Sequence, residues 1–133
     1  MRIYVAAKFE DQALVRETYR RLREAGHVIT LDWTALPTGD RHWGANAIHD
    51  LAGVLTADAV VLHPHDRGKG LYVELGAALA HDIPVFVVGG EMADDDAQVP
   101  CLFMFHPMVW IVRTLDDAMA RLASRVAASR VAE

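Results

Sequence analysis

The chain has 133 residues, of which 53% are hydrophobic and 23% are charged, and we expect one domain that spans residues 1–133. The formal net charge of -5 argues against binding to a nucleic acid polymer, because a phosphate backbone needs a basic protein face. The single cysteine, Cys101, cannot form an internal disulfide, and no apolar run approaches the roughly 20 residues that span a bilayer, so a cytoplasmic protein away from membranes is predicted.

The first third of the chain alternates between strand and helix patterns. Residues 2–6 are a short apolar run typical of a buried strand. Residues 10–25 repeat apolar side chains at helical spacing, and Gly26 follows where a helix end favours a left-handed residue. Residues 28–31 predict a second strand, and residues 32–43, which show little periodicity, predict a loop.

The middle of the chain continues this alternation. Residues 44–56 predict a helix with apolar residues along one side, and residues 59–62 predict a strand that is buried on both faces. Residues 63–70 hold two glycines and predict a loop, residues 71–81 predict a third helix, and residues 84–88 predict a fourth strand.

The C-terminal part completes the pattern. Residues 89–100 predict an acidic, flexible loop, and residues 108–112 predict a fifth strand. Thr114 is expected to cap a last helix that runs to about Ala128. This alternation predicts a flavodoxin-like or Rossmann-like three-layer α/β sandwich, with a five-stranded parallel sheet in the order 2-1-3-4-5.

That strand order places a ligand site between strands one and three, where the direction of the connections reverses. The two loops that meet there, residues 6–10 and residues 63–70, each precede a helix N-terminus whose free N–H groups suit an anion. Lys8 lies in the first loop, and Arg67 and Lys69 lie in the second. We therefore expect a ligand that bears a phosphate or carboxylate, with solvated surface cations as the alternative interpretation.

A single acidic residue, Glu74, stands in the otherwise apolar or small segment GLYVELGAALA. We expect it in the first turn of the third helix, where the helix dipole favours an ionised carboxylate. A Glu that merely stabilises the helix end is the ordinary interpretation. The glycine-containing loop before Glu74 and the small residues Gly76, Ala77 and Ala78 after it favour a functional carboxylate close to the sheet.

Three segments carry a resemblance to a known family: RIYVAA, HDLAGVLTADAVVL and, most specifically, GLYVELGAALA. They resemble the nucleoside 2-deoxyribosyltransferase-like superfamily, whose members transfer deoxyribose or hydrolyse nucleotides at the bond between base and sugar. The resemblance implies that Glu74 attacks the anomeric carbon or stabilises an oxocarbenium-like transition state, that Asp50 handles protons at the leaving base, and that Tyr4 orients Glu74. Taken without the family, Tyr4 fits a core aromatic residue and Asp50 fits a solvent-facing helix residue.

The resemblance implies an enzyme that acts on a small-molecule nucleoside or nucleotide and needs no cofactor. Hydrolysis of a nucleoside or nucleoside 5′-monophosphate is favoured, because the loops near the site are basic and the C-terminal partner residue of the transferases is not seen. Deoxyribosyl transfer, a non-catalytic nucleotide sensor and a purely structural oligomerisation domain are the alternatives. The run from His63 to Asp66 lacks a third ligand at a helpful spacing, so no metal site is expected. The residues expected to contact the substrate lie in the two loops or beside them: Ala6, Lys8, Phe9, Trp33, His63, Arg67, Gly68, Lys69 and Gly70.

The segment VPCLFMFHPMVW is unusually apolar for a stretch that leads into the fifth strand. Large apolar patches on a surface usually mark contacts with a partner. We expect a homodimer or a higher homo-oligomer, with Phe103 and Phe105 near the contact or covering a neighbour's pocket.

Overall fold

The computed structural model describes residues 1–89 and 101–132. Its centre is a five-stranded parallel sheet in the order β2-β1-β3-β4-β5, which confirms the predicted topology. The strands are short and mostly apolar: β1 (Arg2–Ala6), β2 (Val28–Ile29), β3 (Ala59–Leu62), β4 (Val85–Val88) and β5 (Val109–Val112).

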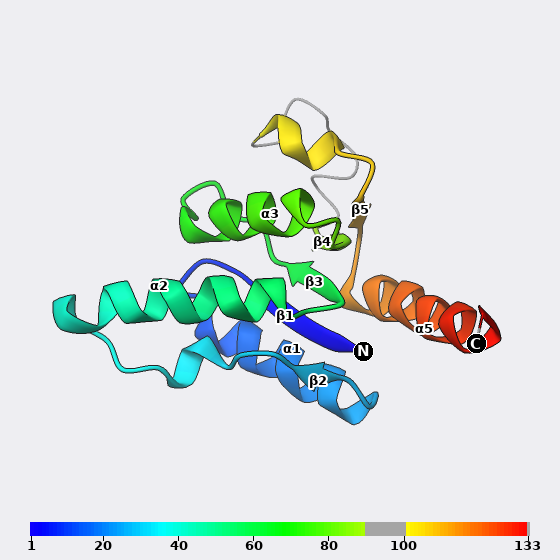
Figure 1. Cartoon of the computed structure of the whole chain (residues 1–133), viewed down its shortest axis with the longest axis horizontal. Helices are drawn as coiled ribbons and strands as arrows, with labels where there is room; N and C mark the ends of the chain where they lie inside the picture. The colour runs from blue at the N-terminus through cyan, green and yellow to red at the C-terminus, as the bar shows by residue number, and fades with distance from the viewer. Residues whose placement is uncertain (90–100, 133) are drawn as a thin grey trace.

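Helices cover both faces of this sheet and make a three-layer sandwich (Figure 1). Four α-helices and two short 3-10 helices belong to the described residues: α1 (Gln12–Glu24), η1 (Trp33–Ala35), α2 (Asp40–Leu55), α3 (Gly70–Ala80), η3 (Leu102–Phe105) and α5 (Leu115–Ala132). On one face α2 packs against α3, and α3 lies over β1, β3 and β4. On the other face α1 and α5 are joined by an ion pair between Arg21 and Asp116.

The core lies between these layers and depends on the two central strands. In β3 all four side chains are buried, as expected for a strand with helices on both sides. In β1 the side chains from Ile3 to Ala6 are fully buried, and the phenol ring of Tyr4 is among the largest of the buried groups. The carboxyl ends of these two buried, paired strands therefore lie side by side, at the point where the direction of the connections reverses.

Two predicted helix ends are confirmed by their hydrogen bonds. Gly26 has a φ of +90°, its N–H donates to the Arg23 carbonyl at 2.9 Å, and the His27 N–H donates to the Leu22 carbonyl at 3.0 Å. This pattern satisfies the last carbonyl groups of α1. At the start of α5 the Asp117 N–H donates to Thr114 Oγ1 at 3.1 Å.

The start of the second helix was predicted wrongly. The helix begins at Asp40 rather than at residue 44, and η1 interrupts the region that was expected to be a loop. The first turn of α2 is polar, so it lacks apolar periodicity, although an acidic residue such as Asp40 suits a helix N-terminus. The expected apolar side of this helix is also exposed: Ile48 is 71% exposed and Leu55 is 43% exposed.

Other boundaries differ by a few residues. The strand β2 is shorter than expected, and α5 continues beyond the expected end to Ala132. The acidic loop that we predicted over residues 89–100 lies, except for Gly89, outside the described residues. Within residues 1–89 and 101–132, no helix combines the length and the apolar character needed to cross a membrane.

Candidate active site

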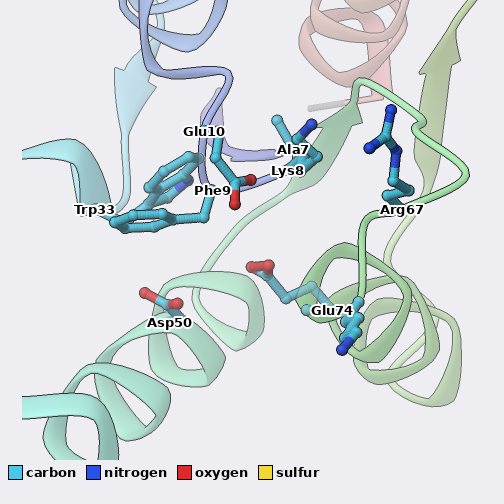
Figure 2. A pocket seen from close by; sticks show the side chains of 10 residues that line it. Ala7, Lys8, Phe9, Glu10, Trp33, Asp50, Arg67 and Glu74 are labelled. Atoms are coloured by element: carbon cyan, nitrogen blue, oxygen red, sulfur yellow. The ribbon is translucent and has the colours of Figure 1, made fainter. Parts of the chain in front are cut away.

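A cavity of about 590 Å³ opens at the carboxyl ends of β1 and β3 (Figure 2). It lies where the strand order predicted a ligand site. Its lining comes from the loop after β1, the loop after β3, and the helices α2 and α3: Ala7, Lys8, Phe9, Glu10, Trp33, Asp50, Arg67, Lys69, Gly70 and Glu74.

Two carboxyl groups enter this cavity from neighbouring helices. Figure 2 shows Asp50 on α2 and Glu74 on α3 turned toward the space between the two helices. The Glu74 side chain is only 8% exposed, and the Tyr4 ring is fully buried in β1. Tyr4 Oη, Asp50 Oδ1 and Glu74 Oε2 are buried, and none has a hydrogen-bond partner among the residues that the structure describes. Buried polar atoms of this kind are rare and often belong to functional sites.

Burial controls the protonation of Glu74. It raises the pKa of Glu74 to about 8, the Asp50 charge raises this pKa further, and the Tyr4 hydroxyl, which faces Glu74 without a hydrogen bond of standard geometry, opposes the shift. Burial also raises the pKa of Asp50, against the influence of His49. At neutral pH the Asp50–Glu74 pair therefore holds at least one proton.

The expectation that the helix dipole keeps Glu74 ionised was wrong. The helix α3 begins at Gly70, so Glu74 comes after the first turn, which contains no acidic residue. The dipole acts mainly within the first turn, and burial therefore outweighs it here. The same burial raises the pKa of Tyr4 well above its usual range, with the Glu74 and Asp50 charges adding to the effect. The Tyr4 phenol is thus a neutral group at physiological pH.

A glycine that sequence reasoning missed lets α2 approach β1. A Cβ added to Gly53 would lie 2.9 Å from Tyr4 Cδ2 and 3.0 Å from Leu31 Cβ, which is closer than side chains tolerate. The Thr30 hydroxyl donates to the Gly53 carbonyl at 2.7 Å and fixes the helix there. Because Asp50 lies one helical turn before Gly53, this close approach also places the Asp50 carboxyl group beside Tyr4 and Glu74. The available signal was a glycine inside a helical pattern.

Aromatic rings form one wall of the cavity. The Phe9 and Trp33 rings are stacked, with centroids 6.4 Å apart and an angle of 28° between their planes. Trp33 Nε1 donates to the Val5 carbonyl at 2.8 Å, which fixes its indole ring. Trp43 meets Phe9 edge-on at a centroid distance of 5.8 Å. A planar ligand would find a rigid aromatic surface at this wall.

Charged side chains surround the other walls. Lys8, Arg67 and Lys69 line the cavity as predicted, and Glu10, which was not predicted, lines it as well. Gly70 lies beside the carboxyl group of Glu74, because a Cβ added there would be at ordinary contact distance, 4.0 Å, from Glu74 Oε1. Three cations against one rim carboxylate suit an anionic group on the ligand.

Three residues that were predicted to bind substrate do not line the cavity. Ala6 is fully buried in β1, and its neighbour Ala7 takes its place. His63 is buried elsewhere: its Nε2 lies 2.9 Å from Thr18 Oγ1 of α1, and burial lowers its pKa to about 4. Gly68 packs against Leu71, whose side chain would lie 2.2 Å from an added Cβ.

Metal ligands are not grouped in the described part of the chain. In residues 1–89 and 101–132, no three or more His, Cys, Asp or Glu side chains are placed to hold a metal ion. His65 Nδ1 instead accepts a hydrogen bond from the Arg67 backbone N–H at 3.0 Å and lies 3.1 Å from Asp66 Oδ1. These contacts organise the loop that carries Arg67 and Lys69.

Comparison with known proteins gives similarity in structure but not in sequence. No protein-family model matches the chain, and no curated protein sequence matches it. A conserved protein from Enterococcus faecalis V583 has a TM-score of 0.72 at 17% identity, covering 94% of this chain and 98% of that one.

Two of the similar structures are of enzymes. A 2-deoxyribosyltransferase from Bacillus psychrosaccharolyticus has a TM-score of 0.65 at 20% identity, covering 89% of this chain and 90% of that one. A CMP N-glycosidase from Clostridium botulinum has a TM-score of 0.58 at 13% identity, covering 92% of this chain and 98% of that one. The chain therefore shares its α/β fold with a 2-deoxyribosyltransferase and a CMP N-glycosidase along most of its length.

Proposed function

We propose that this protein is an N-glycosidase that hydrolyses the bond between base and sugar in a nucleoside or nucleoside 5′-monophosphate. The observation that carries the proposal is the pair Asp50 and Glu74, two carboxyl groups with buried unpaired oxygens that face one cavity. A pair of carboxylic acids can supply both a nucleophile and a proton for glycosidic cleavage. The deoxyribosyltransferase and the CMP N-glycosidase with this fold support the reaction class.

The first step needs one proton on the pair. In the reactive form Glu74 is ionised and Asp50 is protonated. Glu74 attacks the anomeric carbon, the C1′–N bond breaks, and the base leaves with the proton of Asp50. An ester between Glu74 and the sugar results.

In the second step Asp50 acts as a base and Glu74 is the leaving group. A water molecule attacks the anomeric carbon while the Asp50 carboxylate takes one of its protons, and the ester bond to Glu74 breaks. The products are the free base and the free sugar or sugar phosphate. Asp50 is protonated again and Glu74 is again a carboxylate, so the site is ready for another substrate.

Residues around the pair position its groups. Tyr4 faces Glu74 from the sheet, and its neutral phenol is placed to orient the carboxylate. Lys8, Arg67 and Lys69 supply the positive charge that a 5′-phosphate needs. The stacked rings of Phe9 and Trp33 provide a surface for a flat base.

Base release from a panel of nucleosides and monophosphates, separated by chromatography, tests the proposal. We expect turnover by the wild-type protein and a loss on the order of a thousandfold or more in Glu74→Gln, because the amide cannot act as the nucleophile. Substrate binding should persist in this variant. Glu10→Gln, which changes an exposed acid at the same cavity, is the matched control and should change turnover only a few-fold.

Transfer is the second candidate function, and the similarity to a 2-deoxyribosyltransferase favours it. The same assay distinguishes the two reactions when an acceptor base is added. New nucleoside would indicate transfer, whereas free sugar alone indicates hydrolysis. No base release in any ribo- or deoxyribo-form, with or without acceptor, would reject both enzymes and leave a nucleotide sensor.

We also propose that the protein acts in the cytoplasm as a homodimer or higher oligomer. Phe103 is 55% exposed, Phe105 is 62% exposed and Leu102 is 73% exposed, all in η3. Three adjacent large apolar side chains on a surface are typical of a contact with another chain. The proposed contact includes Phe103 and Phe105.

A further inference from the structure

A second cavity of about 380 Å³ adjoins the first along α2. The α2 residues Trp43, Asn46, Ala47 and Asp50 line it, and their spacing places all four on one face of the helix. Phe9, Trp33 and Leu36 form the rest of its lining. The lining residues of the second cavity are thus mostly apolar and aromatic, and Asn46 and Asp50 contribute an amide and a carboxyl group.

The two cavities have different chemistry but share a boundary. Glu74, the cations and Glu10 line only the larger cavity, whereas Asp50, Phe9 and Trp33 line both. Under the proposed function, Glu74 faces the sugar and Asp50 faces the leaving base. The sugar and its phosphate therefore belong in the larger cavity, and the base belongs in the smaller one, with the cleaved bond beside Asp50.

The orientation of the Asn46 amide follows from its partner. Asn46 Nδ2 donates a hydrogen bond to the Pro37 carbonyl at 2.8 Å. A carbonyl oxygen only accepts hydrogen bonds, so the amide must turn its NH₂ group toward Pro37. One N–H of the amide is occupied by this bond, and Asn46 Oδ1 remains as the hydrogen-bond acceptor that the side chain offers a ligand.

Asn46 and Asp50 together define a pattern for the edge of a base. A protonated Asp50 donates to a ring nitrogen, and Asn46 Oδ1 accepts from an adjacent amino group. Cytosine and adenine present this combination of ring nitrogen and exocyclic NH₂. Uracil and hypoxanthine present the opposite one, an N–H group beside a carbonyl oxygen, which would set acceptor against acceptor and donor against donor.

We propose that Asn46 is a specificity-determining residue that selects bases with an exocyclic amino group over their oxo counterparts. The inference rests on the proposed function, because that function identifies the second cavity as the place of the base. The faces of Phe9, Trp33 and Trp43 stack on any base with little discrimination. The choice between amino and oxo bases therefore falls to the hydrogen bonds at the edge.

Matched substrate pairs test this inference. The wild-type protein should release cytosine from cytidine 5′-monophosphate with a kcat/KM roughly tenfold or more above that for uracil from uridine 5′-monophosphate, and adenosine should exceed inosine similarly. In Asn46→Ala the preference should fall to about twofold, because the amino substrates slow down while the oxo substrates do not. Ala45→Asn, which adds an amide at the adjacent exposed position off the lining face, is the control and should keep the wild-type preference.

A binding measurement separates this inference from the proposed function. Calorimetric titration of Glu74→Gln with free cytosine and free uracil should show tighter binding of cytosine, and the added Asn46→Ala change should abolish the difference. Base release without an amino preference, or a preference unchanged in Asn46→Ala, would overturn the inference and leave the glycosidase intact. Absence of all base release would overturn the glycosidase, and equal binding of the two free bases would then overturn the inference as well.

Discussion

Glu74 makes the stability of the protein depend on pH. Its pKa rises from the ordinary 4.5 to about 8 in the folded state, so the folded chain keeps a proton that the unfolded chain releases between these two values. The folded state binds more protons in this window, and stability therefore falls as the pH rises through it. Below about 4.5 the group is neutral in both states and has no such effect.

Glu74→Gln should remove this loss of folding stability at high pH. We expect the variant to match the wild-type protein near pH 4 and to be more stable at pH 9, by on the order of a few kcal/mol. Urea unfolding at several pH values measures the difference. Glu10→Gln replaces an exposed acid and should give a difference that does not change with pH in this way. A gap for Glu74→Gln that stays constant from pH 4 to pH 9 would contradict the assigned burial.

The pH dependence of turnover follows from the one proton that Asp50 and Glu74 need between them. We expect a bell-shaped profile of kcat/KM, with the alkaline limb near the pKa of about 8 at which the Asp50–Glu74 pair loses its last proton, because the doubly ionised pair cannot protonate the leaving base. Asp50→Asn should be much slower and should lose this alkaline decline. Initial rates of base release across pH 5 to 10 check both expectations, and an alkaline decline that persists in Asp50→Asn would count against the assigned roles.

Sequence reasoning selected the two carboxyl groups that meet at the cavity, but it misassigned some of the residues around them. Asp50 and Glu74 were chosen from a segment pattern and a resemblance, and the structure places them at one cavity with Tyr4 beneath. His63 could not be assigned correctly, because at the end of a buried strand no pattern of polar and apolar residues tells which face a side chain takes. The protonation of Glu74 was also out of reach, since it depends on burial by residues distant in the chain.

At the scale of elements, the glycines of α2 offer a matched pair. Gly53→Ala forces a Cβ against the Tyr4 ring, so we expect a loss of stability of about 1–3 kcal/mol and slower turnover, because Tyr4 and Asp50 shift. Gly44→Ala meets nothing within 4 Å in the same helix and should gain about 0.5–1 kcal/mol. Denaturant unfolding of both variants, with base-release rates, tests the contrast. Equal effects of the two changes would show that close packing at Gly53 does not hold the site.

The helix α2 also shows that hydrophobic periodicity alone does not tell which side of a helix faces the interior. Its interior face meets a cavity rather than a packed core, so polar residues such as Asn46 and Asp50 stand where an amphipathic helix would place apolar ones. Its apolar residues Ile48 and Leu55 are correspondingly exposed. Periodicity therefore identified the helix, but its apolar side is not the side that faces the interior.

At the scale of the whole molecule, the fold was predictable because its determinants are local and repeated. Five strand patterns separated by helices leave few topologies that obey right-handed connections, and the order β2-β1-β3-β4-β5 is one of them. Strand and helix patterns within one chain do not predict its contacts with other chains. The exposed apolar side chains of η3 support the proposed contact with another chain.

The proposed oligomer gives a direct test. The double change Phe103→Ser and Phe105→Ser removes the two exposed rings and should convert a dimer or larger assembly into a monomer at high micromolar concentration. Light scattering coupled to size exclusion measures the mass. Val131→Ser, at a side chain that is 87% exposed near the end of α5, is the control and should leave the assembly unchanged. A wild-type protein that is already monomeric would refute the oligomer.

The proposed division of roles along α2 has a consequence for how this protein can change. Trp43 and Asn46 touch only the smaller chamber, while Asp50 stands on the border and Glu74 sits on another helix. Under the proposed function, substitutions on one face of α2 can alter which base is bound while Asp50 and Glu74 are unchanged. We therefore expect a mutational library confined to positions 43, 46 and 47 to change the proposed base preference while the proposed catalytic pair stays in place.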